Sequence, residues 1–396
     1  MKENRLIQGF VALLFFAMFI YGMSCQMIGT LITRIILHYD IRMAQAGLMS
    51  SFINIGNFAA IFLISVLSGR INKLILLGAS LFFFSASLFL ISTAPSFGIL
   101  LACFALVGVF GATLNMIITS LVADMQPDKI SQRVSLVHGF FGLGGLCGPI
   151  VFERLVVNLN WAQAHFIVSM IFVVYLIIYA VFVRWQWSPL MIRMPHEKQS
   201  RFGFSDIVQF FLLKRHLLMW IIVFFYGGGQ STLAIWIKRY VETHLNEPAW
   251  GAYALSAMWL GIAVSRLIIS PGIKAPSLRK IFVGNLISAA ALTAGLFSGS
   301  VQGIAAASLA VGLSSGLTVP LILSLGCEWH PDKTTFGTLM PFTAFYVSYV
   351  VFPPFSGLIS DLLGLPWGVA LGILCAILTS VFSGMLDLHM KTERVK

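Results

Sequence analysis

Long stretches of this chain carry no charged side chain and are apolar throughout, without polar and apolar positions alternating. No Asp, Glu, Lys or Arg occurs in residues 74–123, 281–327 or 334–360. Hydrocarbon offers backbone groups no hydrogen-bond partners, so such segments form helices or closed barrels in a bilayer. Continuous apolarity favours helices over the alternating strands of a barrel. The pattern therefore predicts an all-α membrane protein.

The charge-free stretches divide at Gly, Pro and polar residues into helices long enough to cross a bilayer. We predict twelve, at residues 7–33, 43–69, 74–92, 97–122, 133–156, 162–184, 217–240, 250–270, 279–298, 302–326, 335–360 and 366–387.

Composition and charge place the chain in a membrane with a definite orientation. Of the 396 residues, 58% are hydrophobic and 10% charged, and the net charge is +11. Most Lys and Arg fall at the termini and in alternate loops, which the positive-inside rule places in the cytoplasm. We expect a multi-pass protein of a bacterial inner membrane with both termini cytoplasmic. The net positive charge then reflects basic loops that are retained in the cytoplasm. We therefore expect the lipid bilayer as a partner and no nucleic acid.

The chain reads as two similar halves. The sequence Asp-Met-Gln-Pro-Asp-Lys at 124–129 follows the fourth predicted helix, and Glu-Trp-His-Pro-Asp-Lys at 328–333 follows the tenth. Matching loops at equivalent places indicate internal duplication. We predict an N-terminal six-helix bundle at 1–184, a cytoplasmic linker at 185–216 and a C-terminal bundle at 217–396. Two repeated bundles with a solute site between them are typical of transporters.

A glycine-rich segment in the fifth predicted helix carries the most specific family signal. Residues 138–149 read His-Gly-Phe-Phe-Gly-Leu-Gly-Gly-Leu-Cys-Gly-Pro. Its glycines permit close helix packing, and its proline permits a bend. The layout resembles the fifth-helix motif of the major facilitator superfamily, in the form found in its fucose/proton symporter-like branch. The resemblance implies the major facilitator fold and gating roles for Gly148 and Pro149.

The loop after the second predicted helix resembles another motif of that superfamily. Residues 65–73 read Ser-Val-Leu-Ser-Gly-Arg-Ile-Asn-Lys, where the family has Gly-x-Leu-Ala-Asp-Arg-x-Gly-Arg. Arg70 and Lys73 match, whereas the acidic position is Gly69. The resemblance implies a gating role for both basic residues, without the family's acidic group. Two basic residues in an inner loop are also expected from retention in the cytoplasm alone.

The seventh and eighth predicted helices are similar to the sugar-symporter branch. Tyr226 and Trp236 match an aromatic pattern in which Gln230 replaces a glutamate, and Trp259 precedes Arg266 in a second pattern. The resemblance implies a gating role for Arg266. It implies solute contacts for Tyr226, Gln230, Trp236 and Trp259. From its position alone, Arg266 would extend towards the inner membrane surface, which is the usual behaviour of a basic residue at a helix end.

Polar residues near helix midpoints are the candidates for binding a small-molecule substrate, because a polar side chain in hydrocarbon needs a partner. Interhelical hydrogen bonding is the alternative for each of them. Amides and aromatic faces suit a neutral, polyhydroxylated solute. The predicted solute-binding residues are Gln26, Asn54, Asn57, Asn115, His138, Tyr226, Gln230, Trp236, Trp259 and Tyr346.

The residues that could couple transport to a proton gradient are few. No predicted helix midpoint carries Asp or Glu, and Glu153, Glu242 and Asp361 lie towards helix ends, where we expect solvated roles. His138 is then the best candidate carrier for a coupling proton. The chain has no Gly-x-x-x-x-Gly-Lys nucleotide loop, and we expect no cofactor and no bound metal.

We therefore expect a monomeric secondary active transporter that moves a small, sugar-like solute by alternating access. An exporter of drugs or metabolites on the same fold is the nearest alternative, and a non-transporting receptor is a weaker one. Transport of an anion is a further alternative, because Arg34, near the outer end of the first helix, could bind an anionic solute. No zinc-ligand spacing or nucleophile motif supports a membrane enzyme.

Overall fold

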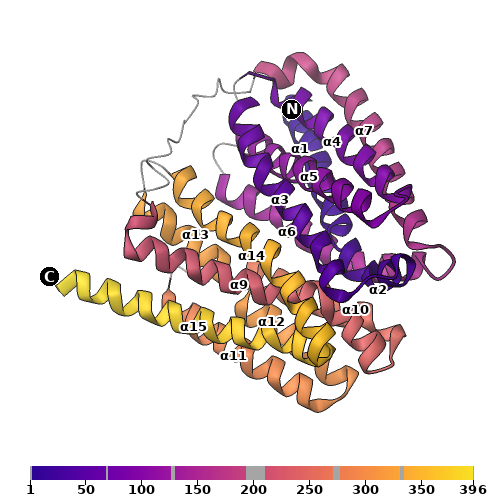
Figure 1. The fold of residues 1–396 in the computed structure, drawn as a ribbon. Helices are drawn as coiled ribbons and strands as arrows, with labels where there is room; N and C mark the ends of the chain where they lie inside the picture. The colour runs from indigo at the N-terminus through magenta and orange to yellow at the C-terminus, as the bar shows by residue number, and fades with distance from the viewer. Residues whose placement is uncertain are drawn as a thin grey trace. The chain divides into compact units, whose positions relative to one another are not determined.

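The fold is a set of long helices, seen in a computed structural model (Figure 1) that describes residues 2–67, 70–125, 130–192, 210–270, 277–330 and 334–395. The helices are α1 (Lys2–Ser24), α2 (Met27–Tyr39), α3 (Met43–Leu67), α4 (Lys73–Ser92), α5 (Phe97–Met125), α6 (Ile130–Leu155), α7 (Trp161–Ile192), α9 (Lys214–Arg239), α10 (Gly251–Val264), α11 (Leu278–Ser298), α12 (Val301–Ser315), α13 (Thr318–Trp329), α14 (Thr334–Leu363) and α15 (Leu365–Val395). Within these ranges they form twelve segments long and apolar enough to cross a membrane, which confirms the predicted all-α class.

Local chemistry sets several helix ends. The side chain of Asn72 accepts a hydrogen bond from the backbone of Leu74 at the start of α4. Ser300 caps α12 in the same way through Gly303. Such caps satisfy backbone N–H groups that the first helical turn leaves free. Gly299, with φ of +58°, ends α11 in a left-handed conformation that glycine adopts without strain.

Two predicted helices are broken, which the sequence pattern did not indicate. The first divides into α1 and α2 at residues 25–26, and the tenth divides into α12 and α13 at residues 316–317. Proline explains the second break, because Pro320 has no N–H to donate to the carbonyl of Gly316 four residues earlier. The seventh and eighth spans also end in π-helical turns, η2 (Tyr240–His244) and η4 (Ser265–Ile269).

Two helix pairings recur in the first and second six spans, as expected for a duplicated chain. In the first set α1 packs on α6 and α4 packs on α7, and in the second set α9 packs on α14 and α11 packs on α15. Glycines bring some pairs into backbone contact. A Cβ at Gly108 of α5 would lie 2.0 Å from the Ile53 carbonyl of α3, and one at Gly312 of α12 would lie 2.2 Å from the Met258 carbonyl of α10. These equivalent contacts support two six-helix repeats.

The chain forms two compact units, of which one contains residues 1–27 and 52–201 and the other 28–51 and 202–396. The second unit therefore includes α2 and the first turns of α3. Asp361, at the end of α14, accepts hydrogen bonds of 3.0 and 2.9 Å from the backbone N–H groups of Met43 and Ala44. Ser50 and Ser51 donate to backbone carbonyls of α14. These bonds join segments far apart in the sequence.

Parts of three predictions lie outside the described residues. These are residues 126–129 and 331–333 of the matching loops, residues 193–209 of the linker, and Gly69 of the loop motif. The contiguous bundles 1–184 and 217–396 stay a prediction.

Candidate functional site

A cavity inside the second unit gathers polar side chains from several helices. Its polar lining residues are Tyr226, Gln230, Asn285, Ser288 and Ser315, from α9, α11 and α12, and its remaining walls are glycine or apolar. Apolar walls with a few convergent polar groups are typical of solute-binding sites. The cavity volume is about 30 Å³, which accommodates one or two waters, so a larger solute requires these helices to separate.

Gln230 presents an unpaired acceptor to this cavity. The residue is 7% exposed, and its Oε1 atom is buried without a hydrogen-bond partner. Tyr226 lies one helical turn earlier on the same face of α9 and is 4% exposed. The structure thus brings these two predicted residues together. A buried acceptor without a partner is costly unless water or a ligand supplies a donor.

Three polar residues of the lining were not among the predicted residues. Asn285 donates to Thr318 Oγ1 at 2.9 Å, Ser288 shares a 2.7 Å hydrogen bond with Ser314, and Ser315 is buried beside the break in the tenth span. Asn285 could have been predicted from the sequence, because it is an amide within the charge-free stretch 281–327. Serines in helices commonly bond their own backbone, so the two serines had no comparable signal.

Arg266 lies beside the cavity, with its side chain directed into the unit. Its Nε donates to the backbone carbonyl of Gly316 at 3.3 Å. This carbonyl is available because Pro320 cannot bond it within the helix. The guanidinium also lies within electrostatic reach of the Tyr226 hydroxyl. Arg266 thus bonds to a backbone group of its own unit, and its extension towards the membrane surface stays a prediction.

The remaining predicted residues of the second unit lie apart from these contacts. Trp236 is fully buried, and its indole N–H donates to Ser356 Oγ at 2.7 Å. Trp259 is buried in α10. Tyr346 is half-buried in α14 and stacks on Phe342. None of the three lines the cavity.

The predicted residues of the first unit are spread over four segments. Gln26 is buried at the break between α1 and α2, next to Gly148. Asn54 is buried in α3 and accepts a 3.0 Å hydrogen bond from Asn57. Asn115 of α5 has a buried Oδ1 without a partner, whereas His138 of α6 is exposed. Their roles in binding stay predictions.

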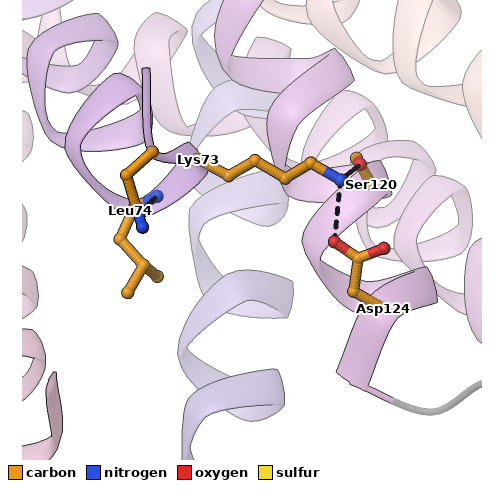
Figure 2. A network of polar contacts seen from close by, with 5 residues as sticks. Lys73, Leu74, Ser120 and Asp124 are labelled. Atoms are coloured by element: carbon orange, nitrogen blue, oxygen red, sulfur yellow. Dashed lines mark hydrogen bonds and ion pairs between the residues drawn. The ribbon is translucent and has the colours of Figure 1, made fainter. Parts of the chain in front are cut away.

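Lys73 forms an ion pair at the end of α5, as Figure 2 shows. Its ammonium donates to Asp124 at 2.8 Å and to Ser120 at 2.7 Å, and both charged side chains are 13% exposed. An aspartate of another helix therefore pairs with Lys73, a basic residue that matches the loop motif. Arg70, by contrast, is exposed.

Removing the Asp124 carboxylate breaks the ion pair that it forms with Lys73. We expect Asp124→Ala to lower the stability of the protein by about 2 kcal/mol, the usual worth of a hydrogen bond to a charged group. Thermal unfolding of the detergent-purified protein measures the change. The matched control is Asp387→Ala, because the Lys391–Asp387 pair is 68% and 35% exposed and should contribute little. Equal shifts in the two variants would contradict this prediction.

The glycine motif of α6 packs directly on α1. A Cβ at Gly144 would lie 2.1 Å from the Phe19 carbonyl, and one at Gly148 would lie 2.9 Å from the Met23 carbonyl. Pro149 is buried inside α6. The predicted close packing is present, and the gating role of Gly148 and Pro149 stays a prediction.

Glu242 is buried and paired, so the solvated role expected for it is wrong. Its carboxylate binds the ammonium of Lys238, and the two side chains are 8% and 1% exposed. The other carboxylate oxygen accepts a 2.7 Å hydrogen bond from Thr33. The pair lies in the last turns of the seventh span, against α2.

Twelve spans in two matching sets, with polar groups facing an internal cavity, are typical of membrane transporters. The chain belongs to the Major Facilitator Superfamily, whose family model matches residues 14–335. It is a multi-pass membrane transporter.

Individual relatives are distant. A TsgA homolog of Buchnera aphidicola subsp. Baizongia pistaciae is 23% identical over 370 residues, which cover 86% of this chain and 88% of the relative. A solved bacterial homolog of the human lysosomal transporter Spinster superposes with a TM-score of 0.69 at 15% identity, covering 96% of this chain and 95% of the other. The E. coli fucose:proton symporter FucP gives 0.64 at 17% identity, covering 95% and 98%. At these identities the structures show a shared fold.

Proposed function

We propose that the protein carries a small, polyhydroxylated, sugar-like solute across a bacterial inner membrane by alternating access, with both termini cytoplasmic. The observation that carries this proposal is the unpaired acceptor of Gln230 in a cavity that also presents Tyr226 and Asn285. Hydroxyl groups are the donors such an acceptor requires, and amides bind them readily. The likeness to FucP, a fucose:proton symporter by name, adds support.

Proton coupling is part of this proposal. His138, exposed on α6, is the candidate carrier, because imidazole is the side chain whose unperturbed pKa lies nearest neutral pH. The predicted residues Gln26, Asn54, Asn57 and Asn115 are the first unit's candidates for completing the solute site, with Trp236, Trp259 and Tyr346 as further candidates in the second.

Export of lipophilic compounds is the second candidate function. The cavity walls favour it, because apolar side chains are more numerous than polar ones on α9, α10 and α11. These apolar residues are Phe225, Leu233, Met258, Ile262 and Leu292. A lipophilic substrate would gain from this surface through burial of apolar area, but it would leave the Gln230 acceptor unpaired.

Gln230→Ala separates the two functions. We expect it to abolish thermal stabilisation by sugars and their uptake into proteoliposomes, because the substitution removes the hydrogen bond to the solute. Gln302→Ala is the matched control, since this glutamine is exposed near the start of α12 in the same unit. Stabilisation by lipophilic cations alone, unchanged in Gln230→Ala, would contradict the sugar-like assignment.

A further inference from the structure

Arg266 is a charged residue of a membrane span that has no carboxylate partner among the described residues. It lies in η4, within the span Pro248–Ile269, and is half-buried. Charged groups in such segments are costly and are usually paired or functional. Lys238, a buried base of the same unit, illustrates the usual solution because it pairs with Glu242.

The contacts of Arg266 hold its guanidinium inside the unit. Nε is fixed on the Gly316 carbonyl, and the group lies near the hydroxyl of Tyr226, which is itself 4% exposed. A guanidinium carries five N–H donors in a planar fork, and it binds carboxylates through two of them. The backbone carbonyl occupies one donor. The two terminal nitrogens have no carboxylate to bind in the described structure.

The neighbouring carbonyl compensates the positive charge only in part. Gly316 follows the last residue of α12, where the helix dipole adds a partial negative charge near Arg266. A partial charge of this kind does not replace an anion. Gln230, one turn after Tyr226 on α9, has the converse need, because its Oε1 acceptor has no hydrogen-bond donor. A ligand that carries both an anionic group and a hydroxyl would satisfy both residues.

We propose that the transported solute is a hydroxylated organic acid whose carboxylate binds Arg266. The carboxylate accepts hydrogen bonds from the guanidinium and from the Tyr226 hydroxyl, while Gln230 accepts a hydrogen bond from a hydroxyl of the same molecule. This inference rests on the proposed transport of a sugar-like solute and names its chemical class. The anionic group distinguishes it from a neutral sugar.

The test compares two solutes that differ in one carboxylate, D-glucuronate and D-glucose, on the detergent-purified full chain. Thermal stabilisation gives binding, and proteoliposomes give uptake. The variants are Arg266→Gln, which removes the charge, and Arg266→Lys, which keeps the charge and loses the fork. Arg279→Gln is the control, because Arg279 is an exposed arginine of the same unit. Sodium chloride and inorganic phosphate alone test whether an inorganic anion occupies the site.

We expect glucuronate to bind at least about tenfold more tightly than glucose, and Arg266→Gln to remove that difference while Arg279→Gln preserves it. Arg266→Lys should fold and bind glucuronate more weakly, which keeps the test valid if Arg266→Gln does not fold. Equal binding of glucose and glucuronate, with dependence on Gln230, would overturn the organic acid and leave the sugar-like function standing. Stabilisation by chloride or phosphate alone through Arg266 would also overturn it. Binding of neither sugar, with binding of lipophilic cations, would overturn both proposals.

Discussion

Gly108→Leu should leave almost no correctly folded protein. A Cβ at this position would lie 2.0 Å from the carbonyl oxygen of Ile53, so a side chain has to force α5 away from α3. Helices in membranes associate mainly through close packing at small residues, and separating them removes that contact along the whole pair. Size-exclusion chromatography of detergent-solubilised protein measures the loss as a missing monodisperse peak.

The same helix provides the control for this experiment. Gly98, in the first turn of α5, has no atom within 4 Å of a built Cβ, so Gly98→Leu should leave yield and melting temperature unchanged. Gly312→Leu should reproduce the loss in the second repeat, where a Cβ on Gly312 of α12 would lie 2.2 Å from the Met258 carbonyl. A normal peak for Gly108→Leu would show that α3 and α5 do not need this contact.

Lys238→Met should be the most damaging substitution of a charged residue. It leaves the Glu242 carboxylate buried with Thr33 as its remaining described hydrogen-bond donor, and removing one partner of a buried ion pair typically costs about 3–5 kcal/mol. For a unit of this size the melting temperature should fall by about 10 °C. Adding Glu242→Gln should recover much of the loss, because a neutral amide still accepts from Thr33.

Lys280→Met controls for the loss of a lysine, since Lys280 is exposed at the start of α11. Thermal unfolding of the single variants and the double variant gives the coupling between Lys238 and Glu242. If Lys238→Met melts at the same temperature as Lys280→Met, the pair does not stabilise the folded protein.

The spans could be predicted because their signal is local. Uninterrupted apolar runs such as 74–92 and 97–122 determine a helix through the properties of the bilayer, whatever lies next to them. The glycine motif at 138–149 likewise indicated close packing from its own composition, and α6 packs on α1 there. Family membership followed from the same local motifs.

The chemistry of the interior could not be predicted in the same way because it depends on distant partners. Glu242 is near the end of its span, and its burial depends on Thr33, 209 residues earlier. Its spacing of four residues from Lys238 was the available signal, since that spacing places two side chains on one helix face. Arg266 is held by the Gly316 carbonyl, which is free only because of a proline in another helix.

The bonds between Asp361 and the start of α3 determine the order in which the chain can fold. Met43 leaves the ribosome early, but its partner lies 318 residues further along the chain, and the partner of Ser50 lies 299 residues further. Contacts this far apart in sequence form late. The segment 28–51 must therefore wait in the translocon or the bilayer until α14 is made. Docking of segment 28–51 on α14 is consequently among the last steps of the protein's biosynthesis.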